Sequence, residues 1–319
     1  MRRFVAVSLV ALTLACDSQP EGAAPDSGGI PQPVSGPFRP LDADVYIADL
    51  HWESSGPPAI GELTNLTRRP GYDNQPYFVP DGSGLWYTAI DEHDGQADIW
   101  RYDFSTRMVT RVTLSNPESE YSATPLPDGS GISAIRVEAD STQRLWRFDG
   151  DGANASVVLA NVAPVGYHAW VDETTVVMFI LGDPPTLQRA DTRSGRAEVL
   201  AENIGRSIQA IPNSFDISYV QRHEDGSTTI MRLPGDGSAA TDIVEGVEGG
   251  DFHAWTPNGT LLMAHEAIIY ARSLDAEGGW QPIADFSGLH IDISRLAVSP
   301  DGSQIAIVAE PALIELGGA

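Results

Sequence analysis

The sequence has no lysine and only one cysteine, Cys16. Its 19 permanently cationic residues are all arginine and stand against 44 Asp and Glu residues, for a formal net charge of −25. A surface of this sign repels phosphate groups, so the composition excludes a nucleic-acid-binding protein. Two interpretations of the charge stay open: solubility, and attraction of cations or a basic partner. A single cysteine also excludes an internal disulfide framework.

Familiar catalytic signatures are missing as well. The chain has no Gly-x-Ser-x-Gly elbow, and His265-Glu266 lacks the second histidine of a His-Glu-x-x-His zinc motif. Asp149 to Gly152 resembles the start of a calcium loop but lacks its length and its terminal Glu, so we interpret it as a hairpin turn. We therefore expect a protein that is not an enzyme and has no cofactor.

The first sixteen residues have the three parts of a secretory signal peptide. Two arginines are followed by an apolar run from Phe4 to Ala15, which is too short to span a bilayer. The Leu-Thr-Leu-Ala stretch before Cys16 resembles the lipobox of bacterial lipoproteins, in which the cysteine becomes the lipidated first residue. An ordinary signal peptide with a chance cysteine is the alternative. We predict a signal peptide over residues 1–15 and lipid attachment at Cys16.

A spacer follows the predicted anchor. Residues 16–43 are rich in Pro, Gly and Ser and have few large apolar side chains, so they cannot bury enough surface to fold. We expect a disordered tether that holds the folded body at the membrane. These features place the protein in the cell envelope of a bacterium, lipid-anchored and facing the periplasm or the cell exterior.

A turn signal recurs along the rest of the chain. It reads Pro-Asp-Gly at residues 80, 127 and 300 and Pro-Asn-Gly at residue 257, with degenerate copies at residues 171 and 212. Successive copies are 47, 44, 41, 45 and 43 residues apart. Pro sets φ for a turn, Asp or Asn bonds the local backbone, and Gly accepts a positive φ. The pattern predicts repeated β-hairpins.

A second signal supports the first. About 18 residues after each turn comes a strand such as Trp100-Arg101-Tyr102-Asp103 or Trp146-Arg147-Phe148-Asp149. A copy at residues 46–49 has no turn before it, and the last turn, at Pro300, has no such strand after it. The chain thus begins with the second half of a unit and ends with the first half of one.

These half units predict a closed ring. Residues 45–50 and 62–67 would supply the outer strands of a blade whose inner strands are residues 296–299 and 304–308. The apolar runs 85–89, 176–180 and 260–263 suit second strands packed between blades. The fold class is therefore all-β: a six-bladed β-propeller of four-stranded blades over residues 44–310, with a tail at 311–319. A flat β-sandwich is the alternative, which the half units argue against.

The repeat resembles the WD40-like repeats of TolB-type propellers, also called PD40. The matching residues are Leu66-Thr67, Asp73, Pro76, Phe78, Pro80-Asp81-Gly82, Asp98-Ile99-Trp100, Asp103 and Val112-Thr113. The resemblance implies a propeller fold and no particular function, because such propellers serve many functions. TolB also carries an α/β domain ahead of its propeller, where this chain has the predicted tether.

One pair of motifs stands out from the repeat. Gly-Tyr-His-Ala-Trp at residues 166–170 and Asp-Phe-His-Ala-Trp at residues 251–255 occupy the same place in two units, on the predicted innermost strand beside the channel. The aligned positions elsewhere are Pro76, Ala123, Ile208 and Leu296. Two histidines among carboxylates could bind a ligand or a divalent cation. The candidate channel residues are His168, His253, Asp73, Glu120, Asp251 and Asp292. The alternative is that both histidines bond a backbone carbonyl and both tryptophans fill the blade interfaces.

Two functional hypotheses follow. In the first, the propeller is a non-catalytic scaffold, a tethered monomer that binds an envelope protein, a peptide or a glycan. In the second, it is an enzyme of the metal-dependent lactonase or lyase type, and the histidine and carboxylate set above holds its cation. We favour the first, because no catalytic signature accompanies the repeat.

Overall fold

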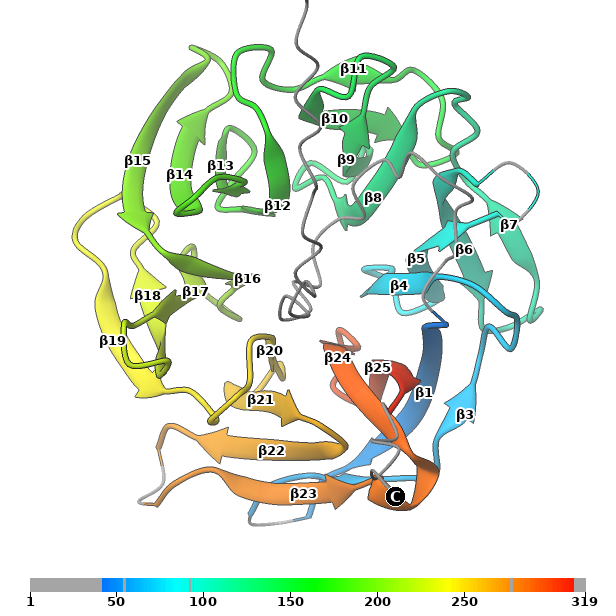
Figure 1. Ribbon diagram of the computed structural model, residues 1–319, viewed down its shortest axis with the longest axis vertical. Helices are drawn as coiled ribbons and strands as arrows, with labels where there is room; N and C mark the ends of the chain where they lie inside the picture. The colour runs from blue at the N-terminus through cyan, green and yellow to red at the C-terminus, as the bar shows by residue number, and fades with distance from the viewer. Residues whose placement is uncertain (1–41, 54–55, 92, 94, 276–277, 313–319) are drawn as a thin grey trace, which may run out of the picture.

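The computed structural model describes residues 42–312, apart from 54–55, 92, 94 and 276–277. Within them the chain forms six antiparallel sheets arranged as blades around a central axis (Figure 1). The described residues contain one short 3₁₀ helix, Ser287–Leu289, and no helix long and apolar enough to cross a membrane. The predicted all-β, six-bladed propeller is confirmed. The predicted signal peptide, Cys16 and nearly all of the tether lie outside the described residues.

Five blades use consecutive strands, running from the axis outward in chain order. The first two blades are β4 (Asp73–Phe78), β5 (Gly84–Ile90), β6 (Ala97–Asp103) and β7 (Val109–Arg111), then β8 (Ser119–Pro125), β9 (Gly131–Val137), β10 (Gln143–Asp149) and β11 (Ser156–Val157). The third blade is β12 (Val165–Trp170), β13 (Thr175–Ile180), β14 (Thr186–Asp191) and β15 (Arg196–Glu202). The last two are β16 (Ile204–Ala210), β17 (Ile217–Arg222), β18 (Thr228–Leu233) and β19 (Thr241–Glu245), then β20 (His253–Trp255), β21 (Thr260–His265), β22 (Ile268–Ser273) and β23 (Gln281–Asp285).

The sixth blade joins the two ends of the described chain. Its inner strands are β24 (Ile291–Val298) and β25 (Gln304–Pro311), and β1 (Asp44–His51) pairs with β25 from Asp44↔Ala309 to Asp49↔Gln304. The predicted closure is therefore confirmed. The outer strand differs from the prediction of one strand over 62–67, because two short strands, β2 (Ala59–Ile60) and β3 (Thr64–Asn65), both pair with β1. The chain between them contains Gly61, whose place opposite the His51 ring leaves little room for a side chain.

The repeated turns have the expected chemistry. In the first, the Gly82 amide donates to the Val79 carbonyl at 2.8 Å, and Gly82 has φ of 73°. The Asp81 carboxylate accepts the Ser83 amide at 2.9 Å. The same two bonds recur at residues 126–130 and 299–303. Proline, acid and glycine therefore serve the scaffold at these positions.

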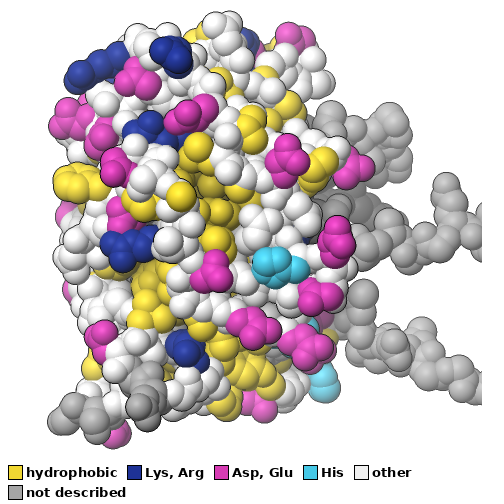
Figure 2. Space-filling model, turned by 90° about the vertical axis from the view of Figure 1, so that its left-hand side faces the viewer, with side chains coloured by type: hydrophobic (Ala, Val, Ile, Leu, Met, Phe, Trp, Pro, Cys, Tyr) yellow, Lys and Arg dark blue, Asp and Glu magenta, His cyan; other side chains and the backbone are white. Residues whose placement is uncertain are grey.

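The second strands form the core between blades. Every residue of β5 and β13 is buried, in keeping with the apolar runs in the sequence. Because each blade presents one face to each neighbour, both faces of these strands lose contact with water. The outer strands are more exposed, and acidic side chains are spread over the face that β15 and β19 present (Figure 2).

Candidate functional site

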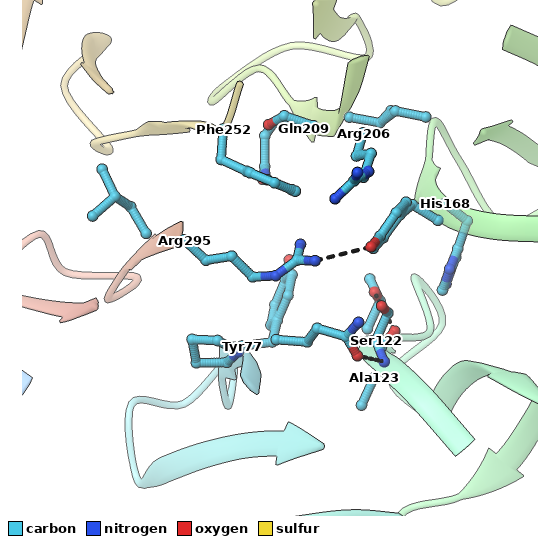
Figure 3. A pocket seen from close by; sticks show the side chains of 15 residues that line it. Tyr77, Ser122, Ala123, His168, Arg206, Gln209, Phe252 and Arg295 are labelled. Carbon is cyan, nitrogen blue, oxygen red and sulfur yellow. Dashed lines mark hydrogen bonds between the residues drawn. The ribbon is translucent and has the colours of Figure 1, made fainter. Parts of the chain in front are cut away.

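A cavity of about 100 Å³ lies at the axis, where the inner strands meet (Figure 3). All six blades contribute to its lining. The lining residues are Gln75, Pro76, Tyr77, Ser122, Ala123, Thr124, Tyr167, His168, Arg206, Ser207, Ile208, Gln209, Phe252, Arg295 and Leu296. Five of the six inner-strand positions that the sequence aligned are among them; the exception is His253, whose neighbour Phe252 lines the cavity instead. The predicted place of the channel is thus confirmed.

Bulges aim the inner strands at the cavity. Inner strands β4, β8, β12, β16 and β24 each shift register against the second strand of their blade. At the bulges of β4 and β8, Gln75 and Ser122 have positive φ angles of 57° and 56°. A bulge turns a side chain out of its usual alternation and is common beside functional sites. Here the bulged segments supply most of the polar side chains in the cavity.

Arg295 is held in the cavity by aromatic rings. Its guanidinium donates to the Tyr167 hydroxyl at 2.9 Å and lies 4.1 Å from the centre of the Phe252 ring and 5.1 Å from that of Tyr167. Such cation–π contacts favour the charged form and fix its position. In the described part of the chain, no carboxylate lies within ion-pair distance of Arg295.

Arg206 enters from the neighbouring β16 and points to the same space (Figure 3). Its side chain forms no hydrogen bond or ion pair with any residue that the structure describes. Burial lowers the pKa of its guanidinium, and the positive charge of Arg295 acts in the same direction. Because the ordinary arginine pKa lies above about 12, the group stays charged at neutral pH. Two cations therefore share the cavity.

Gln75 and Ser122 add two further donors. The Gln75 side-chain oxygen accepts both the Thr88 hydroxyl and the Ser122 amide at 2.9 Å. These bonds fix the orientation of the amide, so its NH₂ group is a donor, and that nitrogen is buried without a partner. The Ser122 hydroxyl is likewise buried and unpartnered. Buried polar groups are normally satisfied, so these two are placed to bond a ligand or water in the cavity.

Two of the predicted carboxylates are held by arginines beside the cavity. Asp251 accepts from Arg222 at 2.8 Å and also lies near enough to Arg206 to favour its charged form. Asp73 is completely buried and paired with Arg69, yet burial still raises its pKa to about 6. Neither residue lines the cavity.

The other two predicted carboxylates differ in their surroundings. Glu120 is completely buried; it accepts from Arg136 at 2.7 Å and from the Ser115 hydroxyl. Burial raises its pKa against the influence of these partners. Asp292 is exposed on β24, in register with Glu310 of β25. Neither lines the cavity, so the carboxylates do not form one cluster there.

The two predicted histidines are joined to the neighbouring blade. His168 Nε2 lies 2.7 Å from Ser133 Oγ on β9, and His253 Nε2 lies 2.7 Å from Ser218 Oγ on β17. The tryptophan two residues later, Trp170 or Trp255, donates its indole N–H to the same serine, at 2.9 or 2.8 Å. The expected blade-interface role of the tryptophans fits, and the histidine partner is a serine hydroxyl rather than a backbone carbonyl.

These Ser–His pairs have the spacing of a nucleophile and its base but not the accessibility. Ser133 and Ser218 are completely buried, and each oxygen already accepts an indole N–H. Burial lowers the pKa of His168 and of His253 to about 3, so both rings are neutral at physiological pH. The pairs therefore serve as structural hydrogen bonds between neighbouring blades.

The described residues contain no group of three or more His, Cys, Asp and Glu side chains that could hold a metal ion. His168 alone of the six predicted residues lines the cavity, and His253 bonds in a different blade interface. The structure therefore does not bring the predicted set together. Ligand binding by these six residues stays a prediction, and the unpartnered donors point instead to their neighbours.

Sequence reasoning missed Arg206, Arg295, Gln75 and Ser122. A signal for three of them existed, because Gln75, Ser122 and Arg295 each directly precede an aligned inner-strand position. Comparing the residue before each aligned position from repeat to repeat would have shown polar residues at positions that face the axis. Arg206 stands one place earlier and depends on the bulge of β16, which the sequence does not reveal.

Comparison with known proteins supports the fold. No family model matches the chain, and no curated protein matches it. A solved structure assigned as TolB from Agrobacterium tumefaciens is similar over 84% of this chain and 98% of its own, with 16% identity and a TM-score of 0.64. TolB from Acinetobacter baumannii is similar over 84% of this chain and 65% of its own, with 10% identity and a TM-score of 0.54. The predicted likeness to TolB-type propellers is confirmed for the fold.

An enzyme shares the same architecture. An oligogalacturonate lyase in complex with manganese is similar over 83% of this chain and 78% of its own, with 17% identity and a TM-score of 0.51. At such low identity these likenesses show a shared β-propeller fold and nothing about chemistry.

Proposed function

We propose that this chain is a non-catalytic binding propeller, which recognises a protein or peptide of the bacterial cell envelope through the mouth of its central cavity. The observation that carries the proposal is the cavity itself, where aromatic rings and unpartnered hydrogen-bond donors from several blades converge. Binding sites of this kind combine an apolar surface with a few polar groups that fix orientation.

The rest of the chain fits this function. The Ser–His pairs are buried structural contacts between blades. The four carboxylates named from the sequence lie outside the cavity. A lipid at Cys16 and a tether over residues 16–43 would hold the propeller at the membrane and leave its cavity mouth free to meet a neighbour. Tyr77, which lines the cavity with 37% of its surface exposed, is the natural contact for a partner.

Site-specific photo-crosslinking in cells tests the proposal. A photoreactive phenylalanine analogue at Tyr77 should crosslink one defined partner, and an excess of unmodified protein should compete for it. Val199, on outer strand β15 with 54% exposure, supplies the matched control and should give no such product. Absence of a competed product at Tyr77, or the same product at Val199, would contradict binding through the cavity mouth.

A further inference from the structure

We propose that the cavity binds a carboxylate group, with Arg206 and Arg295 as its cationic partners. This inference rests on the proposed function and names the group that the ligand presents. The two guanidiniums reach the cavity from β16 and β24, and neither has an ion-pair partner among the described residues (Figure 3). In a chain of net charge −25, two such unpaired cations in one small cavity need a physical reason.

The neutral groups around the arginines are donors too. The Gln75 NH₂ group and the Ser122 hydroxyl are buried and lack acceptors, and they come from two other blades. An oxyanion accepts hydrogen bonds and offers none, so one bound anion could satisfy all four groups. Leaving buried donors unsatisfied destabilises the fold, so these groups favour an acceptor in the cavity.

The walls indicate that the anion is part of an organic molecule. The rings of Tyr167 and Phe252 lie edge to face, with centres 6.4 Å apart, and Tyr77 lines the cavity beside them. A free inorganic anion would make no use of these rings, whereas the carbon body of a carboxylate would pack on them. A volume of about 100 Å³ holds one carboxylate with a short apolar stem rather than a whole sugar or nucleotide.

A metal cation is a poor alternative occupant. Both guanidiniums would repel it, and Asp251, the acid that acts on Arg206, is already bonded to Arg222. The same carboxylate chemistry can come from two sources: an acidic side chain or C-terminus of a protein, or a free organic acid. The arms of the test separate them.

The test is calorimetric titration of the purified full-length protein with benzoate, with benzamide as the uncharged control and inorganic phosphate as the inorganic one. A short peptide ending in Phe, with a free or an amidated C-terminus, forms the protein-derived arm. We expect benzoate and the free-acid peptide to bind, and benzamide, phosphate and the amidated peptide to bind at least about tenfold more weakly.

Two variants locate the site. Arg206→Gln and Arg295→Gln should each weaken benzoate binding about tenfold or more, whereas Arg232→Gln, at an exposed ion pair with Asp216, should leave it unchanged. Arg206 has no partner to lose, so its variant gives a result even if Arg295→Gln fails to fold. Equal affinity of the Arg206 and Arg232 variants, or no benzoate binding by the wild type, would overturn the inference.

Failure of this inference is separable from failure of the proposed function. A competed crosslink at Tyr77 without carboxylate binding would support the proposed protein partner and contradict the proposed carboxylate site. Benzoate binding without a crosslink would support the carboxylate site and contradict the proposed protein partner. A preference for benzoate over both peptides would assign the site to a free organic acid.

Discussion

Arg206 and Arg295 differ from three other arginines of the described chain that are partly or fully buried. Arg69, Arg111 and Arg136 each pair with a carboxylate of their own blade, namely Asp73, Asp98 and Glu120. Breaking such a pair leaves a buried charge, so these arginines belong to the scaffold. Neither cavity arginine forms an ion pair with a described residue, although Asp251 lies near enough to favour the charged form of both. Both guanidiniums are therefore free to bind an anion.

This difference predicts unequal stability effects. Arg206→Gln removes no side-chain hydrogen bond, and the lost attraction to Asp251 is offset by relief of the repulsion from Arg295, so it should change the free energy of unfolding by less than about 1 kcal/mol. Arg295→Gln loses the bond to Tyr167 and the contact with Phe252 and should cost about 1–3 kcal/mol. Urea unfolding measures both. A larger cost for Arg206→Gln would show that it serves the scaffold.

The buried histidines predict a pH effect. The pKa of His168 is about 3 when folded and about 6.5 when unfolded, so the unfolded chain binds more protons between these values. Stability from the neutral ring is complete above pH 6.5 and is lost as the pH falls. The stability advantage of the wild type over His168→Gln should therefore shrink by about 1.4 kcal/mol per pH unit from pH 6.5 towards pH 4.

The pH effect must be measured as a difference between wild type and variant, because Asp73 changes the pH dependence of stability in the opposite direction. Its folded pKa is raised to about 6, so its contribution is complete below its unfolded value and is lost as the pH rises through 6. Both proteins contain Asp73, and the difference between them cancels it. His265→Gln, which removes a histidine outside the core, is the control. A pH-independent difference for His168→Gln would mean that the ring has the same pKa in the folded protein as in the unfolded chain.

The same histidines show why residue roles were only partly predictable. Position on the innermost strand followed from alignment of the repeats, and the structure confirms it. The partner did not follow, because Ser133 lies 35 residues away on another blade and its approach depends on how blades pack. The sequence placed His168 beside the channel, and the structure shows that its ring also bonds a serine of the neighbouring blade.

At the scale of elements, turns and second strands were predictable because their chemistry is local. The Pro-Asp-Gly turn carries its own bonds, and the run of β5 is apolar because both its faces are buried. The bulges were not predictable, since a register shift is set by pairing with the next strand rather than by composition. The candidate site depends on the bulges, and sequence reasoning accordingly missed it.

Closure by β1 predicts a position-specific effect of proline. Ile47 pairs with Ala306 of β25 on one side and Thr64 of β3 on the other, so Ile47→Pro breaks the ladder that closes the ring. We expect a loss of more than about 3 kcal/mol in urea unfolding. Val199→Pro, on outer strand β15 with one neighbour only, should cost clearly less. Similar costs would indicate that the sixth blade is not needed for closure.

At the scale of the molecule, the ring was predictable from the half units at its two ends. A chain that starts with outer strands and ends with inner ones must join them, or leave sheet edges open to aggregation. The pairing of β1 with β25 is that join. The net charge gave no hint of a cationic cavity, because whole-chain composition averages over a few buried residues. The net charge therefore predicted an acidic surface, and only the structure revealed the two arginines in the cavity.

NMR of protein with ¹⁵N-labelled arginine can detect a carboxylate bound between Arg206 and Arg295 at the two side chains themselves. The side-chain signals of these two residues are assigned from the Arg206→Gln and Arg295→Gln variants, and benzoate is then added to the wild type. Both signals should shift together along one saturating curve while that of Arg232 stays in place. Saturable shifts at other arginines with none at these two would contradict the proposed carboxylate site.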